Sequence, residues 1–501
     1  MREWIVRGVA AGSPSPRRAA ALAIAASFAS ACTTDSTPTY QADVRPIFEQ
    51  RCQSCHQPGG IGTFDITYDA AAWADGPPAW AQQAALSVAA GEMPPWMPSQ
   101  DCHAIQDSRA LTTEQRDTVA AWAAANFPAG DESDYVSPAP IEHPMLDRRD
   151  AWGDPDLVLA SPDPYTPVVS RPDDYRCIVV DHDFTEGTWI RGLEVAPEEA
   201  EIVHHLILYA FDASEAASLT QLDAADPEPG YACPGNPTAT TVLAWAPGQV
   251  GEFLPEGIGR YVDAGTKLVM QIHYNTLGRT QDEVPGDRTA TRIWLYPAGE
   301  TPTQAVLQIP FPNMDIRIPA GEPNAAQENT LNLQPLFGNA PIEVPIIGVM
   351  GHMHQLGRAI SLDMQRTGQD EACLLDIPEW NFSWQQSYFF PEDQWAQVGS
   401  DTTLRMTCRF DNSAANQPVV NGEQLTPRDV TWGEGTLDEM CLTYAVALVS
   451  PALLSAIGDI GAVGGGGPAA ADCEPGQTSG CCGDGVCDGP ETVDNCAADC
   501  G

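Results

Sequence analysis

The chain has 501 residues, of which 43% are hydrophobic, and its 68 Asp and Glu against 24 Lys and Arg give a formal net charge of -44. Such a charge excludes a nucleic-acid partner, because phosphate binding needs clustered basic residues. The 15 cysteines favour an oxidising compartment, and because their number is odd, disulfide pairing alone does not account for them.

The first 31 residues have the parts of a bacterial lipoprotein signal peptide. Several arginines precede an uncharged, alanine-rich stretch, which ends in small residues directly before Cys32. The stretch is too short to span a bilayer as a helix. We expect an exported protein, anchored by a lipid on Cys32 in the periplasm, the outer membrane or the cell surface, with no other membrane contact. Ordinary signal cleavage, leaving Cys32 as a free thiol, is the alternative.

Composition divides the rest of the chain. Amphipathic runs rich in alanine predict helices over residues 40–130, where the capping-box pattern Thr112-Thr113-Glu114-Gln115 begins one of them. A linker rich in Pro and Asp covers residues 131–165. Short alternating runs then predict antiparallel β-sandwich structure to about residue 450. A Gly/Ala-rich linker, 451–472, leads to a Cys-rich tail, 473–501.

A C-x-x-C-H motif lies in the helical region. At this spacing the thiols of Cys52 and Cys55 reach the two vinyl groups of a haem, and His56 presents its imidazole to the iron. Half of a zinc site or a redox pair would give the same short motif. No second C-x-x-C follows at zinc-ribbon spacing, which favours covalent haem c.

The residues around this motif resemble class I cytochrome c domains of exported bacterial proteins. The resemblance rests on Asp43 to Phe48 before the motif and on Met93-Pro94-Pro95-Trp96 after it. It implies that Met93 is the sixth haem ligand, with Met97 and His103 as alternatives. A haem with His and Met ligands has no open position, so it should transfer electrons rather than bind O2.

Five of the nine histidines fall in three short patches, which are His204-His205, His273 and His352-Met353-His354. In a strand, residues i and i+2 face the same side, so His352 and His354 can chelate one metal. The adjacent pair can bind one ion together only at a bulge, a twisted edge or a strand end. Imidazoles suit Zn, Cu, Fe or Ni, and an added thioether favours copper. The alternative is that these are ordinary hydrogen-bonded core histidines.

Residues 155–450 resemble the type II copper monooxygenases, the family that includes peptidylglycine hydroxylating monooxygenase and dopamine β-monooxygenase. The motifs that carry the resemblance are His204 to Tyr209, Gln271 to Tyr274, Gly351 to Gly357, Thr407 to Phe410 and Asp438 to Cys441. It implies two all-β, jelly-roll type sandwich domains, 166–320 and 321–450, each carrying one copper.

The same resemblance implies the ligand sets and the chemistry. One copper would take His204, His205 and His273; the other would take His352, His354 and Met440. A Cys408–Cys441 disulfide would pin the methionine. The second copper would meet O2 and, with Tyr444 lining the pocket, hydroxylate an unactivated or benzylic C–H bond of a small organic substrate.

Two departures from the family pattern bear on the substrate. Met350 stands where peptide-amidating members have an arginine that grips the substrate carboxylate, and Leu442 replaces an asparagine. Without a bidentate carboxylate clamp, a peptidylglycine substrate is disfavoured and a more apolar pocket is expected.

A haem fused to such an oxygenase suggests that the haem passes electrons to the three-histidine copper, drawing on an upstream small reductant or redox protein. An independent electron-transfer or sensing module is the alternative for the haem domain. For the whole chain, the alternative is a non-catalytic haem- and copper-binding electron-transfer or surface protein on the same scaffold.

The tail, an aromatic run and the remaining cysteines give three further expectations. Acidic residues among the tail cysteines could bind Ca2+, and a plain disulfide knot would explain them equally well. The aromatic run from Trp380 to Gln385 predicts packing and loop formation. With Cys32 assigned to lipid and Cys52 and Cys55 to haem, six tail cysteines and six body cysteines remain, and each group can pair internally.

Overall fold

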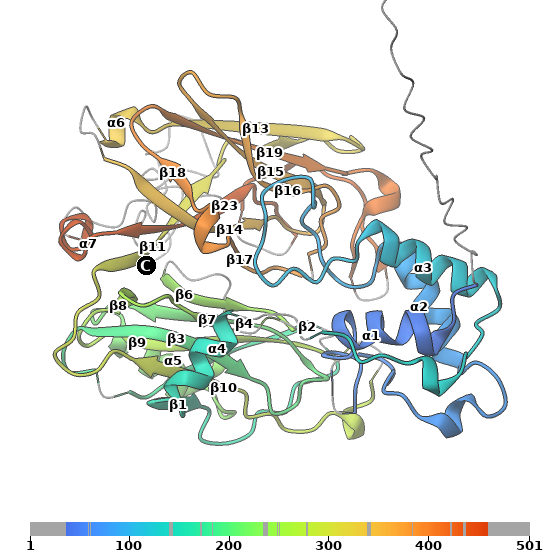
Figure 1. The fold of residues 1–501 in the computed structure, drawn as a ribbon. Helices are drawn as coiled ribbons and strands as arrows, with labels where there is room; N and C mark the ends of the chain where they lie inside the picture. The colour runs from blue at the N-terminus through green and yellow to red at the C-terminus, as the bar shows by residue number, and fades with distance from the viewer. Residues whose placement is uncertain are drawn as a thin grey trace, which may run out of the picture. The chain divides into compact units, whose positions relative to one another are not determined.

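A computed structural model describes residues 37–58, 60, 62–139, 144–170, 173–182, 184–233, 239–247, 249, 251–276, 279–337, 342–382, 384–420, 423–433 and 437–458. The expected signal peptide, Cys32, most of the Gly/Ala-rich linker and the Cys-rich tail lie outside these residues. The described chain is mostly β-sheet with few helices (Figure 1). None of its described helices combines the length and apolar character needed to cross a membrane.

Short helices form residues 40–134, as the alanine-rich pattern predicts. They pack around a core that includes Tyr40, Phe48 and Trp122. The predicted capping box is present, because Thr112 and Gln115 each bond the other's backbone N–H. The elements are η1 (Tyr40–Val44), α1 (Arg45–Arg51), η2 (Ala70–Trp73), α2 (Ala79–Ala89), α3 (Thr113–Ala124) and η3 (Glu132–Asp134).

The stretch expected to be a linker, residues 131–165, contains regular structure instead. Helix α4 (Pro144–Trp152) buries Met145 in an apolar cluster with Phe253, and strand β1 (Leu157–Ala160) pairs with β10. The Pro and Asp content that predicts a linker is tolerated here, because Pro144 is the first residue of α4, where a helix does not need its N–H.

Two antiparallel sheets form the first sandwich. One has strands β1, β10 (Ala290–Leu295), β3 (Thr188–Ala196), β8 (Ile258–Val262) and β7 (Glu252–Phe253); the other has β5 (Tyr231–Ala232), β2 (Asp173–Val180), β9 (Lys267–Asn275), β4 (Val203–Phe211) and β6 (Thr240–Trp245). Apolar side chains from both sheets, including Leu193 and Met270, fill the core between them. Helix α5 (Ala216–Ala225) and the turn η4 (Gln281–Glu283) lie in its connections.

The second sandwich has the same two-layer plan. One sheet contains β11 (Gln304–Pro312), β23 (Leu442–Val449), β14 (Val344–His352), β17 (Tyr388–Phe389) and β18 (Ala396–Val398); the other contains β13 (Ala325–Asn332), β19 (Thr402–Phe410), β15 (Gly357–Arg366) and β16 (Ala372–Ile377). Val349, Ile360 and Met406 are among the core residues that the two sheets contribute. A parallel pairing of β8 with β11 joins the two sandwiches into one ten-stranded sheet.

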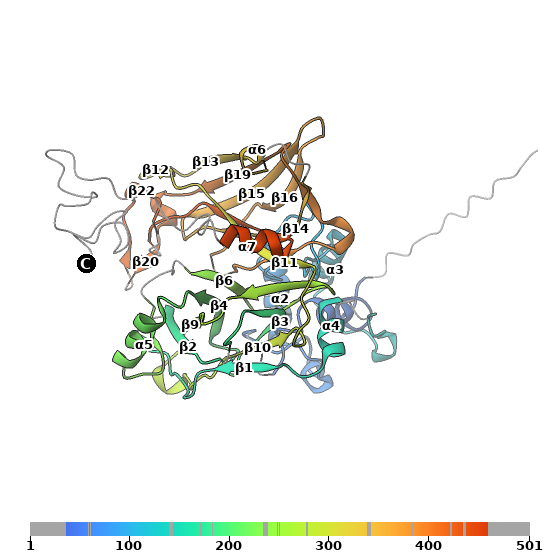
Figure 2. The same cartoon turned by 90° about the vertical axis from the view of Figure 1, so that its left-hand side faces the viewer.

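Short elements complete the second sandwich. They are the two-stranded sheets β12 (Arg317–Ile318) with β22 (Val430–Thr431) and β20 (Val419–Val420) with β21 (Glu423–Gln424), the helices α6 (Gln334–Phe337) and α7 (Pro451–Gly458), and the turns η5 (Glu392–Gln394) and η6 (Ala414–Asn416). Helix α7 lies beside β11, so the stretch expected to be a linker from residue 451 begins with a packed helix (Figure 2).

The disulfides of the described residues pair the six body cysteines with one another, as expected. Cys408 and Cys441 are bridged, which confirms the predicted pair. Cys102–Cys373 and Cys177–Cys233 join the other four body cysteines. Within the part of the chain that the structure describes, only Cys52 and Cys55 are unbridged, which leaves both thiols available for another bond.

Candidate metal centres

Three histidines from two neighbouring strands of the first sandwich meet at one point. His204 and His205 lie on β4 and His273 lies on β9, where the register shifts between Val203 and His205. Of the arrangements that would let both adjacent imidazoles face one ion, which are a bulge, a twisted edge or a strand end, this irregularity matches the first. The three Nδ1 atoms are 3.1, 3.2 and 3.3 Å apart.

Hydrogen bonding among themselves does not satisfy these three nitrogens. Each Nδ1 carries either a proton or a lone pair, so at least two of the three are alike and repel each other at this distance. A point equidistant from the three lies about 1.9 Å from each, and an imidazole–metal bond is about 2 Å long. The cluster therefore fits a metal ion, and three imidazole donors suit copper or zinc.

The surroundings of this cluster are mostly buried and aromatic. His205 and His273 are buried, and the ring of Tyr175 stacks on His273 with centroids 4.2 Å apart. Burial, followed by the charges of His273, His204 and His352, holds the pKa of His205 well below its ordinary value. A neutral imidazole is the form that binds metals.

The second histidine pair lies where β14 ends. His352 Nδ1 is 2.5 Å from Gln385 Oε1, and His354 Nδ1 is 3.0 Å from the carbonyl oxygen of Asp438. Both partners are acceptors. The Asp438 carbonyl oxygen can only accept a hydrogen bond, and the Gln385 side chain presents its oxygen to His352 because its amide nitrogen donates to the Phe382 carbonyl. Each Nδ1 therefore carries the proton, and each Nε2 carries the lone pair, which is how metal-binding histidines are oriented by their outer partners.

His352 in particular has the features of a ligand. Its Nε2 is buried and makes no hydrogen bond to the described residues. Burial, together with the nearby His354, lowers the pKa of His352 to about 3, although the hydrogen bond to Gln385 opposes this shift. A buried nitrogen lone pair without a proton donor is costly unless a metal occupies it.

A buried carboxylate brings the Met440 segment to this pair. Glu439 accepts hydrogen bonds from the backbone N–H groups of His354, at 2.9 Å, and Leu356, at 2.5 Å. Burial raises the pKa of Glu439 to about 8, against the lowering effect of these N–H groups. Met440 is buried, and the Cys408–Cys441 disulfide holds the next residue. A thioether in this segment is available to complete a mixed nitrogen and sulfur site.

The residues expected to line the substrate pocket lie on the strands next to this pair. Tyr444 of β23 pairs with Met350 of β14, and Leu442 pairs with His352. Met350 and Leu442 are buried, whereas Tyr444 is half-buried. Met350, which stands where peptide-amidating members have an arginine, thus places an apolar side chain within the sheet.

One loop contacts both histidine clusters, although its sequence suggests only aromatic packing. We call residues 380–382, 384 and 385 the bridging loop. Trp380 Nε1 donates to the carbonyl oxygen of His354 at 3.3 Å, and Gln385 holds His352. The ring of Trp384 lies 6.1 Å, centroid to centroid, from that of His204. The aromatic composition suggests packing, but only the fold shows what these side chains pack against.

The C-x-x-C-H motif follows directly after α1. His56 is buried, and its Nδ1 lies 3.0 Å from the carbonyl oxygen of Phe64, so Nδ1 carries the proton and Nε2 carries the lone pair. Burial, followed by the neighbouring Cys55, raises the pKa of Cys52 to about 12. Two unbridged thiols beside an oriented imidazole fit covalent haem.

The alternatives for a sixth haem ligand separate in space. Met93 packs against the core of the helical region, whereas Met97 packs against the core of the second sandwich. Met97 Sδ also accepts a hydrogen bond from Asn381 N at 3.2 Å. His103 Nε2 lies 2.8 Å from the carbonyl oxygen of Gln394, on the second sandwich. Of the three, only Met93 lies with the C-x-x-C-H domain.

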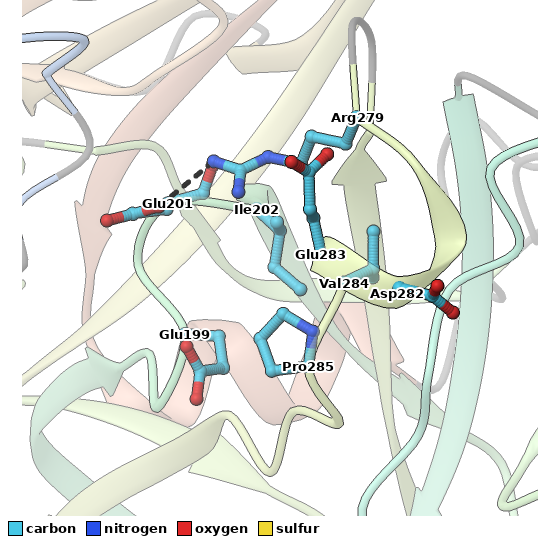
Figure 3. Close-up of a pocket in the computed structure, with 8 residues that line it drawn as sticks. All are labelled: Glu199, Glu201, Ile202, Arg279, Asp282, Glu283, Val284 and Pro285. Atoms are coloured by element: carbon cyan, nitrogen blue, oxygen red, sulfur yellow. Dashed lines mark hydrogen bonds and ion pairs between the residues drawn. The ribbon is translucent and has the colours of Figure 1, made fainter.

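A separate surface pocket lies in the first sandwich (Figure 3). An ion pair of 3.0 Å between Arg279 and Glu201 crosses it, and Glu199, Asp282 and Glu283 add negative charge to its lining. None of the clustered histidines lines this pocket, so we assign it no part in the metal chemistry.

Fold and site together define a class: a two-sandwich β protein with a three-histidine cluster able to hold a metal. DBH-like monooxygenase protein 1 of Gallus gallus aligns over 333 residues at 23% identity, covering 62% of this chain and 48% of that protein. The Homo sapiens and Mus musculus proteins of that name are 26% and 25% identical over 266 and 264 residues, 48% of this chain and 38% of each relative.

These matches support a relationship to the DBH-like monooxygenases. The chain spans less than half the length of the relatives it matches. No protein-family model matches it. A solved structure titled as the STIV MCP aligns over 60% of this chain and 98% of its own with a TM-score of 0.23 and 10% identity, too low to carry an argument.

Proposed function

We propose that this chain is a copper-dependent monooxygenase that hydroxylates an unactivated or benzylic C–H bond of a small organic substrate. The observation that carries the proposal is the triangle of Nδ1 atoms from His204, His205 and His273, whose close approach a bound cation would stabilise. The second set of His352, His354 and Met440 supports it, because its imidazoles are oriented through Nδ1 and a thioether favours reduced copper. Copper would supply the redox chemistry that activates O2.

The protein's own groups would prepare the second site. Gln385 and the Asp438 carbonyl fix the two imidazoles, and Glu439 ties the Met440 segment to the turn after β14. Tyr444 and the apolar Met350 would shape the substrate contact. Without a carboxylate-binding arginine at position 350, we propose an apolar substrate rather than a peptide carboxylate.

We also propose that haem c at Cys52 and Cys55, with His56 and Met93 as ligands, supplies the electrons. This haem would pass single electrons from an upstream donor to copper. Lipid on Cys32, export and Ca2+ in the tail belong to the same proposal, and they concern residues outside the described chain.

Copper titration followed by measurement of O2 uptake tests the function. Anaerobic titration should load two copper ions per chain, and O2 consumption should then depend on a substrate from a panel of alkyl and benzylic compounds. A protein that binds both coppers and never consumes O2 with any reductant would instead be a non-catalytic haem- and copper-binding protein.

A further inference from the structure

A segment of the helical region is fastened to the second sandwich. We call residues 95–109, which follow Met93 closely, the strap. Its Cys102 is bridged to Cys373, Ser99 N donates to the Asp376 carbonyl at 2.7 Å, and Gln106 N donates to the Phe389 carbonyl at 2.7 Å. These contacts extend along much of the strap, so the C-x-x-C-H domain is held to this sandwich by more than its covalent linker (Figure 1).

The strap meets the bridging loop at one hydrogen bond. Met97 Sδ accepts the backbone N–H of Asn381 at 3.2 Å, and Met97 also packs on the sandwich core. Beside it, the rings of Trp96 and Tyr388 meet edge to face at 5.4 Å. The guanidinium of Arg109 lies 5.5 Å from the Trp96 ring. Arg51, directly before the C-x-x-C-H motif, donates a hydrogen bond to the carbonyl oxygen of Ser108 in the strap. The haem-attachment motif and the strap are therefore neighbours.

From Asn381 the loop leads to both clusters. One residue back, Trp380 bonds the carbonyl of His354. Three residues on, Trp384 faces His204, and the next residue, Gln385, holds His352. Asn381 is thus three residues in sequence from a ring contact with the three-histidine cluster and four from a hydrogen bond to the second pair.

We propose that the bridging loop is the route by which an electron passes from the C-x-x-C-H domain to the histidine clusters, with Met97 and Trp384 as its two junctions. This inference rests on the proposed function. From Met93 the route is covalent to Met97, crosses one N–H···S bond to Asn381, is covalent again to Trp384, and ends on the ring of His204.

The electron transfer is balanced as a one-electron exchange. Ferrous haem iron is oxidised to ferric, and one cupric ion is reduced to cuprous; no bond between heavy atoms forms or breaks. An external one-electron donor then reduces the haem again. If this route carries the electron, removing a junction should slow transfer without changing either centre.

Flash photolysis of the full-length, copper-loaded protein measures this transfer directly. Under anaerobic conditions a photoreductant reduces the haem, and the haem absorption band then reports its reoxidation by Cu2+. We expect Trp384→Leu and Met97→Leu each to slow reoxidation by about tenfold or more. Trp189→Leu, which replaces another half-buried tryptophan whose ring contacts Tyr261, should leave the rate unchanged.

The outcomes separate the route from the function. If wild-type haem is not reoxidised by bound Cu2+, electron supply through the haem fails, and the route fails with it. If the wild-type haem passes electrons to copper and both variants do so at the wild-type rate, the route is wrong while the proposed function stands. In both variants, the Cu2+ EPR spectrum and the haem reduction potential should match those of the wild type. If Trp384→Leu changes the EPR spectrum, the rate measured for Met97→Leu decides whether the route is right, because Met97 contacts the loop from the strap side.

Discussion

At the scale of single residues, the geometry of the ring nitrogens is the most informative feature of this protein. The first cluster converges through Nδ1, whereas His352 and His354 use Nδ1 to hold oxygen acceptors and turn Nε2 away from them. The two clusters would therefore offer a metal different imidazole atoms. Sequence spacing identifies these histidines but does not determine which nitrogen each one presents.

The first prediction concerns the Nδ1 triangle. His273→Ala removes the nitrogen that lies 3.1 and 3.3 Å from the other two. In the wild type, Cu2+ at about 100 times its dissociation constant should stabilise the folded state by about 2.7 kcal/mol per site. Thermal unfolding with and without Cu2+ should show a smaller rise in the variant and a loss of one bound copper. An unchanged copper content would contradict the assignment of His273 as a ligand.

The second prediction concerns Gln385 as a positioning residue. Gln385→Ala removes the acceptor that keeps His352 in the Nδ1–H tautomer. The Cu+ affinity of the second site should fall by about 10- to 100-fold, measured by competition with a coloured chelator. Gln397→Ala, on exposed surface of β18, is the matched control and should bind copper normally. Equal affinities in both variants would remove Gln385 from the site.

At the scale of elements, β-sandwich structure follows from the alternating pattern, but the elements that connect the sites do not. The bulge on β4 and the Cys408–Cys441 bridge could be inferred because adjacent histidines and an ordered family motif constrain them. The strap and the bridging loop could not, since Met97 and Asn381 are far apart in sequence and neither segment has a repeating pattern. Their contacts depend on tertiary packing alone.

The third prediction concerns the disulfide of the strap. Replacing Cys102 and Cys373 by Ser should lower the stability of the strap against local opening by about 3 kcal/mol. Hydrogen exchange should then show faster exchange over residues 95–109. The matched pair Cys177→Ser with Cys233→Ser, which opens a disulfide in the first sandwich, should leave exchange in the strap unchanged. Equal protection in both double variants would show that the strap does not need its disulfide.

The fourth prediction concerns acid stability of the first sandwich. Hydrogen bonds from buried Arg176 lower the pKa of Asp226 to about 2. A lowered folded-state pKa stabilises the protein above the unfolded pKa, and the gain is lost as pH falls from about 4 to about 2. After solvent screening, Asp226→Asn should cost about 1 kcal/mol at pH 7 and only a small fraction of that at pH 2. Urea unfolding at both values checks this, and an equal loss at both would refute it.

At the scale of the whole molecule, the described parts form a connected assembly. The two sandwiches share a ten-stranded sheet through β8 and β11, and the strap fastens the helical region to the second sandwich. Under the proposed function, this connectivity would let the domain around Cys52, Cys55 and His56 serve sites more than a hundred residues further along the chain. Composition predicts the separate parts, whereas their fastening depends on long-range contacts that no local pattern encodes.

The measurement that tests the central claim most directly is the fate of labelled oxygen. Copper-loaded protein with reduced haem is given 18O2 and an apolar substrate, and the product is weighed by mass spectrometry. A monooxygenase should place one 18O atom in the product, and Met440→Leu should abolish this while leaving the haem spectrum unchanged. Product without 18O, or equal labelling by Met440→Leu, would contradict the assignment.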